Sequence, residues 1–210
     1  MNPLKLFVSP RRAVRDAYEK PNLAIAFVLV LAPVVFVAAM QSFLGLEFVI
    51  QDFAWTLAST ILAWLAGGII LYILLYALKG GTIHGRLSGA LSAFSLLYAI
   101  RFAIFAVFFA AIMLVAPQLP AKLSALTHTA PGMDDAQLMS ELGNIPTASQ
   151  DTVLIIMPLT FVVLSLLVLF AVYFFYLLVA EEGRGGLLKN LVMMVLFLGF
   201  LILINSVLGA

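Results

Sequence analysis

The chain has 210 residues, of which 64% are hydrophobic and only 10% charged, and its formal net charge is +1. Soluble domains carry roughly 25% charged residues, so this chain has too few polar side chains to cover a water-exposed surface. The balanced charge argues against nucleic acid as a partner. The absence of cysteine excludes disulfides, thiolate metal sites and cysteine nucleophiles. Composition therefore predicts an integral membrane protein.

Residues 1–22 predict a short amphipathic lead-in on the cytoplasmic side. Ser9 and Pro10 suit the N-cap and first position of a helix, and Pro21 ends it. Its apolar face is formed by Ala13, Val14, Ala17 and Tyr18. Its polar face offers charge pairs four residues apart, namely Arg12–Asp16, Arg15–Glu19 and Asp16–Lys20. We expect an interfacial helix on the inner leaflet, which either anchors the topology or docks a partner.

Five apolar stretches are long enough to cross a bilayer as helices. They lie at about 23–44, 53–78, 88–116, 153–180 and 187–208. The first is too long for a secretory signal and is read as an uncleaved helix. Residues 117–152 are predicted to be an external loop with one short helix near 133–141. Residues 23–210 thus form a single transmembrane domain, an all-α bundle of five helices.

Lys and Arg residues predict the orientation, because they accumulate on the cytoplasmic flanks of short loops. Most of them precede the first stretch or lie in the second and fourth connections, which share one side of the membrane. They are Lys5, Arg11, Arg12, Arg15, Lys20, Lys79, Arg86, Arg184 and Lys189. The opposite side has Lys122 with six carboxylates. Five crossings therefore place the N-terminus in the cytoplasm and the C-terminus outside, in a multi-pass plasma-membrane protein.

Arg101 is the one ionisable residue well inside a predicted spanning helix, and such residues are costly and often functional. Two orientations are open from the sequence. Arg101 either extends to the inner headgroups, or faces the bundle beside Tyr98 and Phe105 and attracts an anion or a polar headgroup. Arg101, Tyr98 and Phe105 are therefore the candidate intramembrane site.

Small residues recur every fourth position on the second stretch and around the third, which lets helix backbones approach closely. They are Ser59, Ala63 and Gly67, and Gly85, Gly89 and Ala93. This pattern predicts tight packing between these two helices. Arg11, Arg12, Arg15, Lys79 and Arg86 are the candidate cytoplasmic contacts for anionic lipids or a partner.

No catalytic, cofactor or metal site is predicted. His84 and His128 lie on opposite sides of the predicted topology, so they cannot share a metal or a catalytic triad. His128 with Asp134, Asp135 and Glu141 offers a cation site, but carboxylates in a loop are usually solvated. The glycine clusters at 80–81 and 185–186 lack the P-loop pattern.

Several short stretches resemble the Yip domain family, whose name comes from interaction with Ypt/Rab GTPases. Asn2-Pro3 with Ser9-Pro10-Arg11-Arg12-Ala13 and Pro21 resembles the basic lead-in of its prokaryotic members. Lys79-Gly80-Gly81-Thr82 and the helix from Gly89 to Tyr98 are similar to the family's double glycine and the helix after it. The five-helix plan is shared.

The resemblance covers nearly the whole chain and implies a non-enzymatic integral membrane protein of prokaryotic type. Rab binding is not implied, because the chain has no Asp-Leu-Tyr-Gly-Pro type motif and Tyr98 stands where a proline is common. The leading hypothesis is a scaffold, adaptor or membrane-organising protein without a cofactor. Its expected partners are anionic inner-leaflet lipids and a membrane protein or a second copy. The alternative is a small transporter, permease or channel that uses Arg101.

Overall fold

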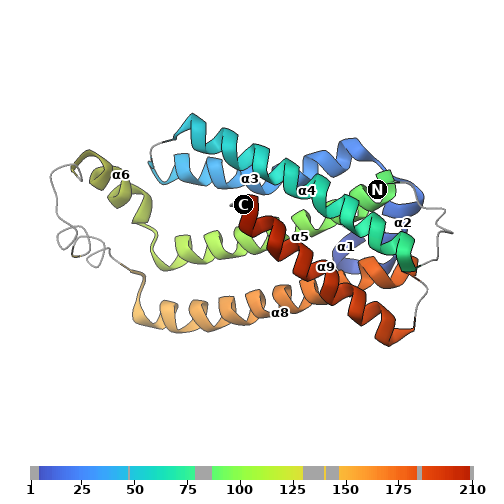
Figure 1. Cartoon of the computed structure of the whole chain (residues 1–210). Coiled ribbons are helices and arrows are strands. Elements are labelled where there is room, and N and C mark those ends of the chain that lie inside the picture. Colours follow the sequence, from blue (N-terminus) through green and yellow to red (C-terminus); the bar gives the residue numbers. More distant parts are fainter. Residues whose placement is uncertain are drawn as a thin grey trace.

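The computed structural model describes residues 5–46, 48–78, 87–129, 140, 147–183 and 186–208, and within these ranges it is helical without strands (Figure 1). Its helices are α1 (Lys5–Val8), α2 (Pro10–Glu19), α3 (Leu23–Phe43), α4 (Ile50–Leu78), α5 (Leu87–Val115), α6 (Leu119–Thr129), α8 (Gln150–Gly183) and α9 (Leu187–Leu208). Helices α3, α4, α5 and α8 are long and apolar enough to cross a membrane. The chain is therefore an all-helical membrane bundle.

Helix α6 was not predicted, since the one helix expected in the external loop at 117–152 was placed near 133–141. It follows α5 after a short turn and contains Pro120 in its first turn, where a missing backbone N–H removes no helical hydrogen bond. The turn between α3 and α4 packs on α6, since a Cβ at Gly45 would lie 2.7 Å from the Cβ of Ser124. The short helix predicted near 133–141 falls outside the described residues, apart from Ser140.

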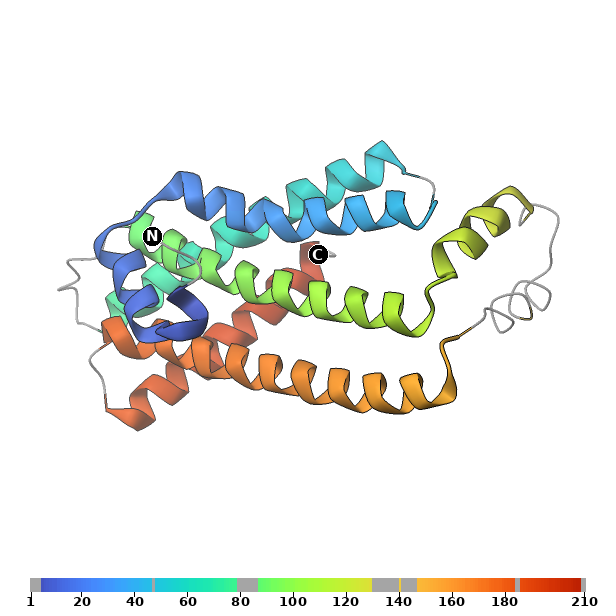
Figure 2. The ribbon, with the colours of Figure 1, turned by 180° about the vertical axis from the view of Figure 1, so that it is seen from behind.

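The bundle has two unlike ends, which we name the α2 end and the α6 end. Helices α1 and α2 fold against one end, and α6 with the α3–α4 turn forms the other (Figures 1 and 2). The buried core lies toward the α2 end and includes residues of α2, α4, α5, α8 and α9. Its large members include Val14, Leu91, Phe94, Phe174, Leu177 and Phe197.

Toward the α6 end the helices separate and expose apolar side chains. In α8 no residue before Phe174 is buried, although this stretch is strongly apolar. Leu154, Phe161 and Leu169 are all more than half exposed. Apolar side chains on the outside of a spanning helix face acyl chains and need no protein partner.

Helix α9 differs from the other apolar helices in its course. Figures 1 and 2 both show it running obliquely across the bundle and ending near the middle of the bundle's length. It packs on α4 and α8, and its 22 residues make it about as long as α3, which has 21.

Two glycines allow α4 and α5 to approach closely. A Cβ at Gly67 would overlap the Phe94 ring, and one at Gly68 would overlap Leu91. Trp64 lies one turn away, and its indole N–H donates to the Leu91 carbonyl at 3.0 Å. These contacts align the middle of α4 with the first half of α5.

Candidate functional site

Arg101 lies midway along α5, with equal lengths of helix on either side. At about 1.5 Å per residue, each end of this helix is roughly 21 Å from Arg101. A cation at such a depth is unfavourable in hydrocarbon unless it meets water, a polar group or an anion. Its side chain is nevertheless exposed to the space between helices, so the surroundings of its guanidinium decide its role.

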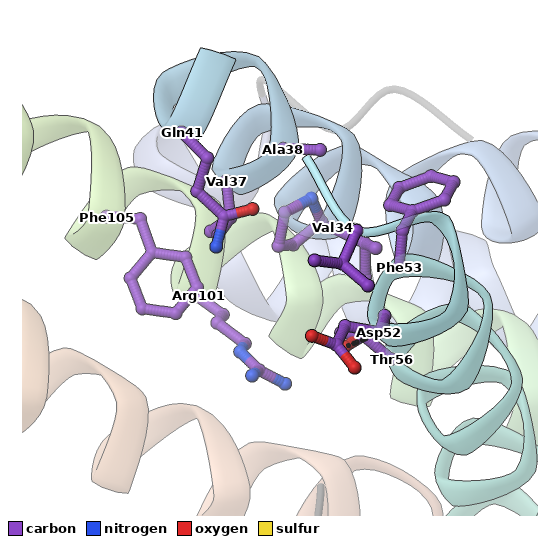
Figure 3. Close-up of a pocket in the computed structure, with 11 residues that line it drawn as sticks. Val34, Val37, Ala38, Gln41, Asp52, Phe53, Thr56, Arg101 and Phe105 are labelled. Atoms are coloured by element: carbon purple, nitrogen blue, oxygen red, sulfur yellow. Dashed lines mark hydrogen bonds between the residues drawn. The ribbon is translucent and has the colours of Figure 1, made fainter. Parts of the chain in front are cut away.

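One cavity of about 250 Å³ lies beside Arg101, between α3, α4 and α5 (Figure 3). Its polar lining comes from Gln41 near the end of α3, from Asp52 and Thr56 in the first turns of α4, and from Arg101. The rest of its wall is apolar and is formed by Pro33, Val34, Val37, Ala38, Val49, Phe53 and Phe105. We name this space the Asp52 cavity.

A second cavity of about 240 Å³ lies on the other side of Arg101, between α4, α5, α8 and α9. We name it the Phe175 cavity. Its lining is mostly apolar and includes Ala63, Phe94, Leu97, Ile104, Ala171, Phe175 and Leu201. Thr60, Tyr98 and Arg101 provide its polar atoms. Arg101 therefore lines both cavities, of which the Asp52 cavity has the larger share of polar groups.

The immediate contacts of Arg101 agree in part with the expected aromatic pair. Its guanidinium carbon lies 5.4 Å from the centroid of the Phe105 ring, a cation–π distance. Tyr98 is buried and directs its hydroxyl to the Thr60 carbonyl at 3.5 Å, while it shares the Phe175 cavity with Arg101. Among the described residues, no carboxylate forms an ion pair with Arg101.

The structure favours one of the two orientations that the sequence leaves open for Arg101. Gln41 and Asp52, which share its cavity, belong to the ends of α3 and α4 that meet at the α6 end. The α2 end of α5 is the densely buried part, with Gly89 to Leu96 all buried. Arg101 therefore faces the cavities within the bundle, on the side of the α6 end.

The apolar face of α2 packs on protein, which corrects the expectation of a helix lying on lipid. Ala13, Val14, Ala17 and Tyr18 are all buried against the bundle, and α2 contacts α5 and α8. The Tyr18 hydroxyl donates to the Leu178 carbonyl at 2.9 Å. Amphipathic spacing fits either environment, because both offer an apolar surface to the same helix face.

The charges of α2 also differ from the predicted local pairs. Arg15 donates from Nε and Nη2 to Glu181 Oε1 in α8, with a distance of 2.8 Å for Nε. The hydrogen bond and charge of Glu181 raise the pKa of the Arg15 guanidinium. Asp16 pairs with Lys5 at 3.3 Å, and the described residues contain none of the predicted i, i+4 ion pairs. Long-range partners thus replace the helical neighbours.

The remaining predicted contacts divide between described and undescribed residues. Arg11 and Arg12 are exposed on the polar face of α2. Lys79, Arg86 and Gly85 lie outside the described residues, as do His84, Asp134, Asp135 and Glu141. Ser59, Ala63, Gly67 and Ala93 are all buried, and Gly67 lies at the α4–α5 contact. Gly89 instead meets α2, since a Cβ there would lie 2.9 Å from the Tyr18 carbonyl oxygen.

Sequence reasoning missed three polar residues that the fold brings to these sites. Gln41 near the end of α3 and Asp52 in the first turn of α4 both line the cavity with Arg101. Glu181 had no assigned role and pairs with Arg15 across more than 160 residues of sequence. Only the tertiary arrangement brings these residues together. The placement of a carboxylate at the start of a spanning helix opposite an intramembrane arginine was the one available signal.

In the described part of the chain, no three His, Asp or Glu side chains gather as a metal site would require. Comparison with protein-family models, curated proteins and solved structures finds no match to this chain. The argument about function therefore rests on the cavities around Arg101 and on the docked α2.

Proposed function

We propose that this chain is a non-enzymatic integral membrane protein, of the Yip type that its sequence resembles, which acts as an adaptor at the cytoplasmic face of a plasma membrane. It crosses the membrane five times, with α9 as the fifth crossing, its N-terminus inside and its C-terminus outside. The Lys and Arg distribution supports this orientation.

The observation that carries the adaptor proposal is the rigid docking of α2. Its buried face, the Tyr18 hydrogen bond and the Arg15–Glu181 ion pair fix this helix on the bundle. Arg11 and Arg12 remain exposed on the opposite face and are held at a defined position relative to the membrane. A fixed pair of guanidinium groups suits recognition of an acidic helix or anionic headgroups.

Photo-crosslinking in native membranes tests the adaptor function. A photoreactive residue in place of Arg12 should give a discrete protein adduct that depends on the remaining Arg11. Arg11→Ala should weaken this adduct several-fold, because it removes the second guanidinium of the pair. The matched control is the same residue at Val28, an exposed position on α3, which should give lipid adducts alone. Lipid adducts alone from position 12 as well would contradict an adaptor function.

A small transporter is the second candidate, and the two cavities that share Arg101 favour it. Transport would require the packed core at the α2 end to open, because Leu71, Leu91 and Phe174 fill it. Flux of anionic and zwitterionic solutes into proteoliposomes, lost on Arg101→Gln, would support this candidate. Absence of flux with the wild-type protein would remove it and leave the adaptor.

A further inference from the structure

We propose that the Asp52 cavity binds the headgroup of a zwitterionic phospholipid. The Arg101 guanidinium contacts its phosphate and the Asp52 carboxylate contacts its ammonium group. This inference does not depend on the adaptor function, because it concerns the opposite half of the bundle from α2.

Opposite charges that face one cavity without pairing carry this proposal. Figure 3 shows the Arg101 guanidinium and the Asp52 carboxylate directed into the same space, with the Gln41 amide beside them. Within the described residues, neither charge has an ion-pair partner. A ligand with an anionic and a cationic group would compensate both charges at once, whereas a simple anion would be repelled by Asp52.

The size and donor set of the cavity fit such a headgroup. Its volume of about 250 Å³ corresponds to roughly eight water molecules at about 30 Å³ each, enough for a phosphoethanolamine group. Arg101 offers a fork of N–H donors to phosphate oxygens, and Gln41 adds amide donors. The Thr56 hydroxyl donates to the Asp52 carbonyl at 2.8 Å and leaves the Asp52 carboxylate available to an ammonium group.

The Phe175 cavity supplies the place for an acyl chain. It adjoins Arg101 and is lined mainly by apolar side chains, among them Leu97, Ile104 and Phe175. A lipid with its phosphate at Arg101 can extend its chain along this wall, which favours an amphiphile over a soluble zwitterion of the same headgroup. Arg101 then marks the boundary between headgroup and chain.

Native mass spectrometry of the purified full chain after mild delipidation tests this site. We expect the wild type to retain phosphatidylethanolamine in preference to phosphatidylglycerol. Arg101→Gln should lower retention of both lipids, because both carry a phosphate. Asp52→Asn should lower the ratio of ethanolamine to glycerol lipid about tenfold, because it removes the partner of the ammonium group and the repulsion of anions.

Asp151→Asn is the matched control for Asp52→Asn. Asp151 also lies in the first turn of a spanning helix and is also exposed, but it does not line the Asp52 cavity, so the lipid ratio should not change. Ala171→Phe is a second control of a different kind. It narrows the Phe175 cavity without altering charge and should lower retention of both lipids while leaving their ratio unchanged.

Three results would overturn the proposal. Equal retention of the two lipids by the wild type would exclude zwitterion recognition. An unchanged ratio of ethanolamine to glycerol lipid in Asp52→Asn would exclude a contact between the Asp52 carboxylate and the ammonium group. Displacement of the bound lipid by free phosphoethanolamine at concentrations matching the lipid would identify a soluble zwitterion as the ligand. Because Asp52 is exposed and its variant leaves the core intact, a failure to fold would not hide the answer.

Discussion

Gly89 is the residue at which α5 lies directly against the backbone of α2. It belongs to the first turn of α5 and lies against the backbone of Tyr18, the penultimate residue of α2. A side chain here would press on a carbonyl group that cannot rotate away, whereas the clash at Gly67 is with an aromatic ring. The absence of a side chain at Gly89 therefore sets the distance between α2 and α5.

Gly89→Ala should destabilise the protein by about 1–3 kcal/mol, because overpacking costs more than the gain in helix propensity of about 1 kcal/mol. Thermal unfolding in a mild detergent measures the effect. Gly199→Ala in α9 is the control, because a Cβ there meets nothing within 4 Å. It should be neutral or raise stability by up to about 1 kcal/mol. Equal changes in unfolding temperature in Gly89→Ala and Gly199→Ala would show that the α2–α5 contact is not tight.

At the scale of elements, α2 behaves as part of the bundle and not as an appendage. Its buried face joins α5 and α8, and its Arg15 contacts Glu181, whose side chain is only 14% exposed. Phe7 in α1 adds a stacked contact with Phe170 at 5.8 Å between ring centroids. The lead-in therefore covers apolar surface at the ends of α5 and α8 that would otherwise face water or headgroups.

Glu181→Gln should loosen α2, because a neutral acceptor holds the Arg15 guanidinium less strongly than a carboxylate does. The natural chain has no cysteine, so Ala17→Cys introduces a single thiol at a buried position of α2. In this background we expect Glu181→Gln to speed maleimide labelling about three- to tenfold, since labelling follows the population of the detached helix.

Asp16→Asn serves as the comparison for Glu181→Gln. It breaks the Lys5–Asp16 ion pair, which joins α1 to α2 and whose side chains are both exposed. Because this pair does not reach the bundle, the labelling rate of Ala17→Cys should stay as it is in the parent. Faster labelling in Asp16→Asn than in Glu181→Gln would mean that α1, and not α8, holds α2 in place.

At the scale of the whole molecule, length and hydropathy were enough to locate the long helices. The stretches predicted at 23–44 and 88–116 match α3 and α5 to within a residue at each end, because charge, proline and glycine mark their limits. The Asn22 side chain caps α3 and accepts from the Ile25 N–H at 3.0 Å. Such signals are local and can therefore be read from sequence.

Contacts between residues of different helices could not be predicted from such local signals. Arg15 has a carboxylate one turn away in its own helix and yet binds Glu181 of α8, so helical spacing alone named the wrong partner. Asp52 precedes Arg101 by 49 positions, and only the antiparallel packing of α4 on α5 places them at one cavity. The candidate site was thus predictable for Arg101 and Phe105 but not for its carboxylate.

The direction of α9 determines the topology of the whole chain. Its 22 residues correspond to about 33 Å of helix, close to the roughly 30 Å of a hydrocarbon core. Its oblique course in Figures 1 and 2 shortens the distance that it covers along the bundle. A full crossing therefore requires the bilayer to be thin there or α9 to tilt back toward its neighbours.

Labelling of single cysteines with a membrane-impermeant maleimide on intact cells tests whether α9 crosses the membrane. With five crossings, Ser149→Cys and a cysteine appended after Ala210 should be labelled, while Glu19→Cys and Gly186→Cys should react only after lysis. Ser149, Glu19 and Gly186 are all exposed, so protection at any of them reports the membrane and not burial. If the appended cysteine is protected together with Gly186→Cys, α9 enters the membrane without crossing it. The Lys and Arg bias would then still fix the first four crossings, because it depends on the connections before α9.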